Sequence, residues 1–218
     1  MIKLDNISKI YNIGKSNEVK ALKNLSLTIH DGENIAITGA SGSGKSTLLN
    51  ILSTIDTPTT GNYYFDNVNV NKLSNAEQAK LRNSKIGLIV QDYALIDELS
   101  ALQNVMLPLL IAGKTSKATA IQALKSVELS ELIHQEVSQM SGGQRQRVAI
   151  ARSMITGTKV LLADEPTGAL DSMTTKNIMQ LLFELNKNGI TLIMVTHDKG
   201  IASMFQRKIE LRDGMIVE

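Results

Sequence analysis

The chain has 218 residues, a formal net charge of +2 from 23 basic and 21 acidic side chains, and no cysteine. A balance this close to neutral indicates neither a nucleic-acid-binding surface nor an acidic tail. The lack of cysteine excludes disulfides, thiolate zinc sites and a cysteine nucleophile. The length suits one large domain or a core with an inserted lobe.

The N-terminal residues 1–5 lack the apolar stretch of a signal peptide. The apolar stretch 105–112 is interrupted by Pro108. It is also shorter than the ~20 residues that span a bilayer. We therefore expect a cytoplasmic protein that reaches a membrane only through a partner.

Several stretches near the start of the chain are predicted to be strands. They are residues 2–7, 22–29, the apolar run 34–38, and 63–66 with 68–70 around a turn. We expect an antiparallel β layer beside the loop that follows residue 38. Tyr11 comes shortly after the first strand, where an aromatic side chain usually belongs to the core.

The loop after residue 38 is rich in glycine and leads into an apolar helix. It reads Gly39, Ala40, Ser41, Gly42, Ser43, Gly44, Lys45, Ser46 and Thr47. A strand, such a loop and a helix N-terminus together direct backbone N–H groups and a partial positive charge toward one point. Lys45 would reach the outer phosphates and the Ser46 hydroxyl would bind Mg²⁺. The sequence therefore predicts a site for a nucleoside triphosphate.

The middle of the chain is predicted to be largely helical. Ser74 and Glu77 form a capping box that starts a short helix, and the apolar run 86–90 predicts a buried strand ending at Gln91. From Asp92 to about residue 152 the composition is helical, with helices expected at 118–129 and 144–154. We interpret this region as an inserted helical lobe.

The last third returns to alternating strands and helices, which predicts a mostly parallel sheet. Strands are expected at 160–163 and 191–196, a helix at 178–185, and a hairpin from 208–211 and 215–217. Ligands gather at the carboxyl ends of parallel strands.

Four polar residues are predicted at those strand ends, namely Gln91, Asp164, Glu165 and His197. Asp164 is suited to hold Mg²⁺, and Glu165 to polarise an attacking water. Gln91 and His197 are candidates to contact the metal, the γ-phosphate or that water.

A second predicted anion-binding helix start lies at Ser141-Gly142-Gly143-Gln144. A serine followed by two glycines leaves backbone N–H groups open at a helix N-terminus. This motif comes about a hundred residues after the glycine-rich loop. We expect one γ-phosphate to be bound by both helix N-termini.

With these motifs together, the chain resembles, over its whole length, the ATP-binding subunit of ABC transporters. The matching motifs are residues 39–47 for Walker A, 160–165 for Walker B, Gln91 for the Q-loop, Ser141 to Gln144 for the signature, residues 168–171 for the D-loop, and His197 for the switch histidine. The resemblance implies an α/β P-loop fold with a mostly parallel core sheet, an antiparallel β subdomain and an inserted helical subdomain.

The resemblance also implies roles for single residues. Tyr11 matches the aromatic that stacks on adenine, so we favour that role over a core position. Gln91 would join Ser46 and Asp164 at Mg²⁺, and Asp171 belongs to the D-loop. Two copies would pair head to tail, with each ATP held between Walker A of one copy and the signature of the other.

As domain boundaries we expect residues 1–91 and 158–218 for the core and about 92–157 for the helical subdomain. The finer resemblance is to the subgroup that serves macrolide export, lipoprotein release and bacitracin-type peptide resistance. It is carried by residues 48–52, 56–61, 81–83, 107–109 and 164–172. Three positions depart from the usual pattern, namely Met140 for leucine, Gln103 for glutamate and Val90 for an aromatic residue.

We expect an ATPase that drives separate membrane permease subunits from the inner face of the cell membrane. Two alternatives remain, an ATPase that moves a signalling or cell-division partner without cargo, and a soluble ABC protein acting on DNA or translation. For the permease contact we expect the exposed members of an apolar group, Tyr93, Leu95, Ile96, Leu99 and Leu102. The sequence names neither the cargo nor the direction of transport.

Overall fold

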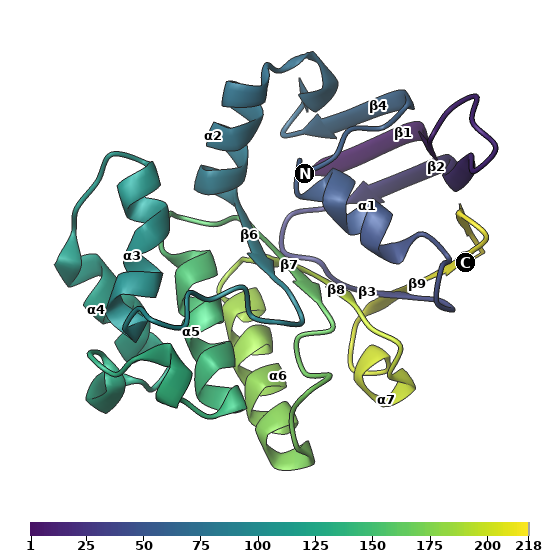
Figure 1. The fold of residues 1–218 in the computed structure, drawn as a ribbon. Helices are drawn as coiled ribbons and strands as arrows, with labels where there is room; N and C mark the ends of the chain where they lie inside the picture. The colour runs from purple at the N-terminus through teal and green to yellow at the C-terminus, as the bar shows by residue number, and fades with distance from the viewer. Residues whose placement is uncertain (218) are drawn as a thin grey trace. The chain divides into compact units, whose positions relative to one another are not determined.

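The computed structural model describes residues 1–217, and the chain divides into two compact units. The first unit holds Met1–Ala79 and the C-terminal part from Thr191, and the second holds Lys80–Ile190. Figure 1 labels the helices and strands of both units. Each unit contains part of the predicted site.

A four-stranded antiparallel sheet lies in the first unit, in the order β2-β1-β4-β5. Its strands are β1 (Ile2–Tyr11), β2 (Val19–Ile29), β4 (Thr60–Phe65) and β5 (Val68–Asn69). Buried apolar residues of β1 and β2 pair in register, as Ile2 does with Ile29 and Leu4 with Leu27. One face of the sheet is therefore apolar, as alternation along the strands predicts.

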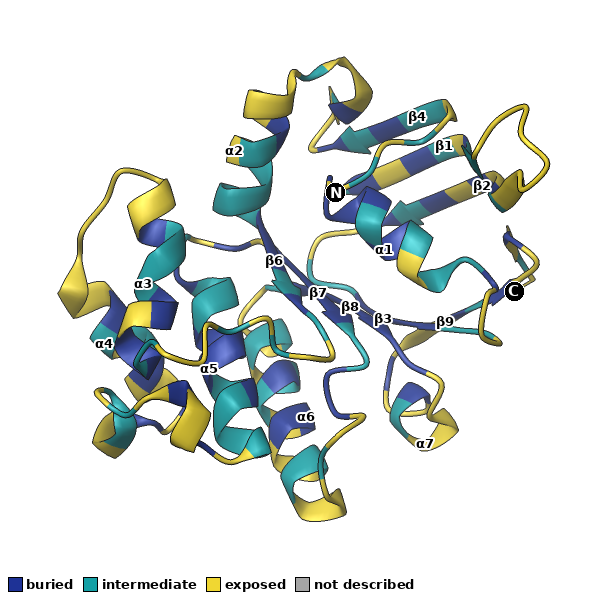
Figure 2. Ribbon diagram, in the orientation of Figure 1, coloured by how far each residue is buried: buried dark blue, intermediate teal, exposed yellow. Residues whose placement is uncertain are grey.

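The first unit also contains the strand that leads into the glycine-rich loop. The strands around it are β3 (Asn34–Thr38), β8 (Thr191–Val195), β9 (Arg207–Arg212) and β10 (Met215–Ile216), in the order β10-β9-β3-β8. β3 runs parallel to both β8 and β9. Figure 2 shows β3 and β8 dark blue, as buried strands, which is typical of parallel sheets. Helix α1 (Lys45–Leu52) follows the loop, and the short α7 (Lys199–Ala202) follows β8.

The second unit combines a parallel strand pair with a group of helices. The strands are β6 (Ile86–Ile89) and β7 (Val160–Asp164). The helices are α3 (Ala101–Ile111), α4 (Lys117–Ser126), α5 (Gly142–Met154) and α6 (Ser172–Lys187), and α2 (Asn75–Lys85) contains residues of both units. Short 3-10 helices lie at η1 (Val70–Lys72), η2 (Ser130–Leu132) and η3 (Val137–Gln139). Helices α3, α4 and α5 pack against one another (Figure 1).

The start of helix α3 explains why Gln103 can stand where the family pattern usually has glutamate. Its N-cap is Ser100, whose hydroxyl accepts a hydrogen bond from the Gln103 backbone N–H at 3.3 Å. The Gln103 side chain accepts one from the Ser100 N–H at 2.8 Å. Gln103 therefore completes a capping box as a glutamate would, because both side chains offer a carbonyl-type oxygen at the same reach.

The predicted strands and helices are confirmed, although most of their bounds differ by one to six residues. The helix expected at 118–129 ends at Ser126, because the backbone becomes left-handed at Glu128, with φ 62°. The helix expected from residue 144 begins at Gly142, because Ser141 caps it. Within residues 1–217, no helix is both long and apolar enough to cross a membrane.

Candidate functional site

The glycine-rich loop between β3 and α1 approaches neighbouring backbone too closely for side chains at two of its positions. Gly39 has φ 146°, and a Cβ there would lie 2.3 Å from the Leu211 carbonyl oxygen. Gly44 has φ 105°, and a Cβ there would lie 2.5 Å from the Ala21 carbonyl oxygen. Only glycine fits both the conformation and the space. The loop therefore keeps its backbone N–H groups directed at the start of α1.

Two side chains of this loop are suited to bind an anion. The Lys45 ammonium donates hydrogen bonds to the carbonyl oxygens of Gly39 and Ala40, each at 2.9 Å, which holds the charge over the loop. The Ser43 hydroxyl is buried and has no hydrogen-bond partner among the described residues. A buried hydroxyl without a partner is costly, so a ligand oxygen at this place would satisfy it. The loop thus fits a bound phosphate group.

The predicted histidine lies at the same sheet edge as this loop. β3 and β8 are parallel, with Ile37 beside Val195. The Thr196 N–H donates to the Ile37 carbonyl oxygen at 3.1 Å, so the segments that follow β3 and β8 leave the sheet side by side. His197 is exposed there.

Tyr11 is held in place at the end of β1 by two charged neighbours. Its hydroxyl donates to a carboxylate oxygen of Asp56 at 2.8 Å, and the Lys9 ammonium lies 4.9 Å from the ring centroid and pairs with Asp56. Burial raises the pKa of Tyr11, and the bond to Asp56 raises it further. Burial alone would raise the pKa of Asp56, but the hydrogen bonds from Lys9 and Tyr11 outweigh it and lower that pKa. The ring is thus fixed and partly exposed.

In the second unit, the structure brings the predicted carboxylates and Gln91 together. β6 and β7 are parallel, with Ile89 beside Ala163. Gln91 and Asp164 therefore lie at the same edge of this strand pair, where both strands end. The backbone at Glu165 is left-handed, with φ 45°. A Cβ built on Gly168 would lie 3.7 Å from the Glu165 carboxylate and 3.9 Å from the Gln91 side-chain nitrogen. The two side chains therefore converge on one place.

The second predicted anion site is the exposed start of α5. The Ser141 hydroxyl accepts the Gln144 N–H at 3.3 Å, and the Gln144 side chain accepts the Ser141 N–H at 2.9 Å. Because the Ser141 oxygen acts as an acceptor in the cap, its hydroxyl hydrogen stays available for an outside acceptor. The structure therefore presents a hydrogen-bond donor at a helix N-terminus, with the helix dipole behind it.

The start of α6 packs directly against this helix. Asp171 caps α6, accepting hydrogen bonds from the N–H groups of Met173 at 3.0 Å and Thr174 at 2.9 Å. The hydrogen bonds from the Thr174 side chain and backbone lower the pKa of Asp171. A Cβ on Gly143 would lie 2.6 Å from the Thr174 methyl group, so the glycine permits the close packing.

Sequence reasoning missed three contacts that shape the site. They are Thr174 against Gly143, Lys9 over Tyr11, and Arg152 on the backbone of Tyr93 and Ala94. Only the contact of Thr174 could have been suspected from nearby sequence, because Asp171 followed three residues later by Thr174 is typical of a helix cap. The other two join residues that no periodicity connects.

The comparisons with known proteins agree with this geometry. The profile of the family described as "ABC transporter" matches residues 22–168. The chain is 46% identical over 224 residues to the uncharacterized ABC transporter ATP-binding protein MJ0796 of Methanocaldococcus jannaschii, covering 99% of this chain and 95% of that protein. It is 48% identical over 220 residues to the macrolide export ATP-binding/permease protein MacB of Campylobacter jejuni. That match covers 100% of this chain but only 34% of MacB, so the chain spans about a third of that relative.

A solved structure supports the fold as a whole. It is described as the dimeric structure of a post-hydrolysis state of the ATP-binding cassette MJ0796 bound to ADP and Pi. The TM-score is 0.91 at 45% identity, and the match covers 100% of this chain and 97% of that one. The α/β fold class predicted from the sequence is confirmed.

Proposed function

The chain belongs to the ABC transporter family and is an ATPase of that family, and from this premise we propose that two copies close on two ATP molecules to power a separate membrane permease. The observation that carries this proposal is the exposed, capped start of α5. Ser141 there offers a hydroxyl hydrogen that its own chain does not use for the cap. A phosphate loop that worked alone would need no second helix N-terminus for the same anion.

Different residues around the loop would bind the phosphates and the adenine of ATP. Residues 39–47 hold the phosphates through backbone N–H groups, and Lys45 exchanges its bonds with the loop carbonyls for bonds to the outer phosphates. Tyr11, fixed by Asp56, offers a ring on which adenine can stack.

The donor set proposed for Mg²⁺ fits that ion. Ser46, Gln91 and Asp164 each offer an oxygen, and Mg²⁺ prefers oxygen ligands and shares them with substrate phosphates. When bound, Mg²⁺ neutralises the charge that develops on the transferred phosphate.

For hydrolysis, we assign Glu165 the task of polarising the attacking water. Its carboxylate lies near the Gln91 amide in the second unit, so both can orient the same water. The attack forms a bond from water to the γ-phosphorus and breaks the bond to the β-phosphate, leaving ADP and phosphate. His197, at the edge that also carries the phosphate loop, is assigned to the γ-phosphate.

The second copy completes each site. The Ser141 hydroxyl and the backbone N–H of Gly143 from one copy would donate to the γ-phosphate held by the other, with Asp171 beside them. The dimers described for MJ0796 support this arrangement in a relative.

We place the protein at the inner face of the cell membrane, bound to its permease. The names of MacB and of a probable syringafactin export protein, 44% identical over 220 residues, favour export. Macrolide, antimicrobial peptide and lipoprotein-like molecules are the proposed cargo classes. Of the predicted contact group, Ile96 is exposed, with 44% of its surface accessible, whereas Leu102 is core. Ile96 therefore leads the proposed permease contact.

The experiment that tests this function compares two variants by size-exclusion chromatography with light scattering. Glu165→Gln should form a dimer with ATP and stay monomeric with ADP, because only ATP supplies the γ-phosphate acceptor. Adding Ser141→Arg should abolish that dimer and leave ATP binding to the monomer intact. A Glu165→Gln protein that stays monomeric with ATP, even beside its permease, would contradict the proposal, as would an equally stable dimer in the double variant.

A further inference from the structure

Lys9 is a mostly buried cation beside the proposed adenine site. It lies on β1, two residues before Tyr11. Its ammonium is 4.9 Å from the centroid of the Tyr11 ring, which is within the range of a cation–π interaction. Only 13% of the Lys9 side-chain surface is exposed. Lys9 therefore covers one face of the ring and is not simply directed into solvent.

Asp56, in the segment after α1, joins Lys9 to Tyr11. One carboxylate oxygen of Asp56 accepts a hydrogen bond from the Lys9 ammonium, and the other accepts one from the Tyr11 hydroxyl at 2.8 Å. The ammonium also donates to the Thr57 carbonyl oxygen at 2.9 Å, and the Thr57 N–H donates to Asp56 at 2.7 Å. These bonds hold the ring in one orientation within a single chain.

The face of the ring opposite Lys9 is the one left for a base. Val19 pairs with Tyr11 in the register of β1 and β2, and 53% of its surface is exposed. Residues directly opposite each other in an antiparallel pair have side chains on the same face of the sheet. A flat base stacked on Tyr11 would therefore have exposed apolar surface beside it.

We propose that Lys9 positions the base of the nucleotide: it confines adenine to the opposite face of Tyr11 and, with Asp56, holds the ring in the orientation for stacking. The proposal deepens the proposed function and rests on it, because it assumes that adenine stacks on Tyr11. Lys9 is a positioning residue, since it acts through the ring and does not touch the nucleotide. A ring that is already fixed loses little freedom on binding, which favours affinity for the base.

The test measures binding of ADP and of inorganic pyrophosphate by isothermal titration calorimetry. Pyrophosphate occupies the phosphate loop but has no base, and neither ligand supplies the γ-phosphate for dimerisation. Lys9→Met removes the charge and keeps the length of the side chain, whereas Lys9→Arg keeps the charge. Affinity for ADP should fall about 3- to 10-fold in the methionine variant, as expected when a side chain must be immobilised on binding, and by less in the arginine variant. Affinity for pyrophosphate should stay unchanged in both.

A double-mutant cycle with Tyr11→Leu shows whether Lys9 acts through the ring. Without the ring, Lys9→Met should cause no further loss of affinity for ADP. The same loss with and without the ring would mean that Lys9 contacts the nucleotide directly. Equal losses for ADP and pyrophosphate would mean that Lys9 supports the phosphate loop. Equal losses in the methionine and arginine variants would mean that the charge is not what acts. Each of these three results would overturn the proposal.

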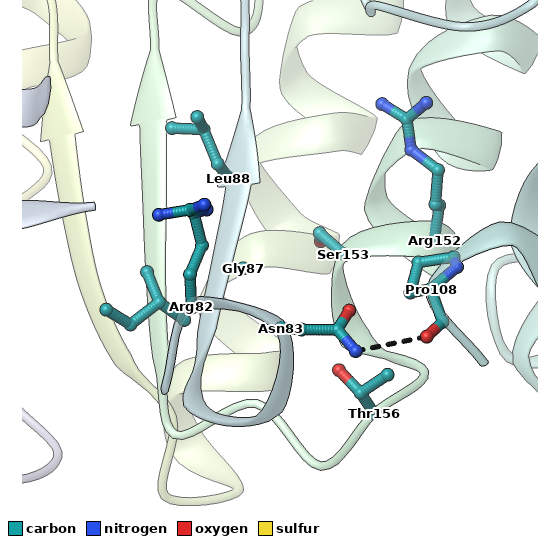
Figure 3. A pocket seen from close by; sticks show the side chains of 9 residues that line it. Arg82, Asn83, Gly87, Leu88, Pro108, Arg152, Ser153 and Thr156 are labelled. Carbon is teal, nitrogen blue, oxygen red and sulfur yellow. Dashed lines mark hydrogen bonds between the residues drawn. The ribbon is translucent and has the colours of Figure 1, made fainter. Parts of the chain in front are cut away.

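Two control variants should bind ADP as the wild type does. Arg207→Met is matched to Lys9, because Arg207 also donates to a carboxylate, that of Glu33 at 3.2 Å, and to a carbonyl oxygen, that of Thr28 at 2.8 Å. Asn83→Ala, in the second unit, controls for a general loss of stability. Figure 3 shows Asn83 beside a pocket lined by residues of α2, β6, α3 and α5, where its side chain donates to the Pro108 carbonyl oxygen at 3.1 Å. None of the residues that line this pocket is assigned to ATP.

The outcomes separate this inference from the proposed function. If Tyr11→Leu weakens binding of ADP and Lys9→Met does not, adenine stacks on Tyr11 without help from Lys9, and only this inference fails. If Tyr11→Leu binds ADP like the wild type, the base does not stack on Tyr11, and the adenine contact of the proposed function fails with it. A higher affinity for ADP in Lys9→Met would mean that Lys9 occupies the face that adenine needs, which also overturns the proposal.

Discussion

The two helix N-termini that we assign to ATP are built in opposite ways. Helix α1 starts at Gly44, a left-handed residue with no side chain to cap it, and Lys45 directly follows. Helix α5 is capped by Ser141, which makes a complete capping box with Gln144, and the cation of its first turn, Arg145, donates to the carbonyl oxygens of Met140 and Ser138. The first end leaves its amide groups open beside Lys45, whereas at the second end the Gln144 amide is already occupied by the cap of its own chain.

This difference indicates an order of events. An open N-terminus with a lysine can bind a phosphate by itself, because amide groups and charge act together. A capped N-terminus that offers the Ser141 hydroxyl and the Gly143 N–H, without a lysine aimed at the anion, adds less affinity, so it acts on a phosphate that is already held. ATP would therefore bind each copy first, and the dimer would follow.

The largest expected effect is on turnover, and it tests the step after both ends meet the phosphate. Glu165→Gln should lower the rate of ATP hydrolysis by roughly 10²- to 10⁴-fold, the usual contribution of a positioned base. ATP affinity should remain, because neither helix end changes. Phosphate release under single-turnover conditions measures the rate, and Glu184→Gln, an exposed glutamate of α6, is the control. A near wild-type rate would remove Glu165 from the role of polarising water.

The next effect separates the two ends by affinity for ATP in the monomer. Lys45→Ala should weaken binding roughly 10- to 100-fold, because a charge-assisted hydrogen bond contributes about 1.5–3 kcal/mol. Ser141→Ala should leave the same affinity unchanged. Isothermal titration calorimetry with ATP measures the affinity of each monomeric variant. Equal losses in the two would mean that the capped end also binds ATP within one copy, and the proposed order would be wrong.

The architecture followed from the sequence wherever one short stretch contained the whole signal. The apolar runs 34–38 and 86–90 predicted buried strands because parallel strands are covered on both faces. Ser74 predicted the start of α2, and its hydroxyl indeed binds the Glu77 N–H at 3.4 Å. Strand-end positions also brought Gln91 and Glu165 together, because parallel strands end at one edge.

What the sequence did not predict depends on contacts between distant elements. Arg152 was expected only as part of a helix, since nothing in its surroundings pointed to the carbonyl oxygens of residues 93 and 94. The bound of α4 was wrong because a single left-handed residue, Glu128, ends the helix without a glycine. Left-handed conformations of ordinary residues are set by tertiary packing, and local propensity does not show them.

A smaller effect distinguishes the cap on α5 from its contact with phosphate. Ser141→Ala should destabilise the fold by about 0.5–2 kcal/mol through loss of the cap, whereas Ser141→Asp should keep most of the stability because aspartate is also a good N-cap. Both variants should lose the ATP-dependent dimer in a Glu165→Gln background, the aspartate one through repulsion of the γ-phosphate. Urea unfolding and light scattering measure the two properties. A stable dimer in the aspartate variant would argue against contact between this end and the phosphate.

The smallest expected effect concerns a third helix start, α6, whose cap is a titrating carboxylate. Hydrogen bonds from Thr174 lower the pKa of Asp171 in the folded chain, so folding favours the ionised form. Its contribution to stability is therefore complete above the pKa of the unfolded state, about 3.9, and is lost as pH falls through the lower folded value. Neither α1 nor α5 has an acidic residue at its start, so this dependence should belong to α6 alone among the three.

The measurement for α6 is the difference in melting temperature between wild type and Asp171→Asn, which removes the charge and keeps a capping side chain. Above about pH 5 the difference should be constant, with the wild type higher, and it should shrink as pH falls below about 4. Asp213→Asn, at an exposed aspartate between β9 and β10, is the control and should show no such trend. A difference that stays constant down to the acid unfolding of both proteins would mean that the charge of Asp171 does not stabilise α6, and that all three helix ends depend on neutral groups alone.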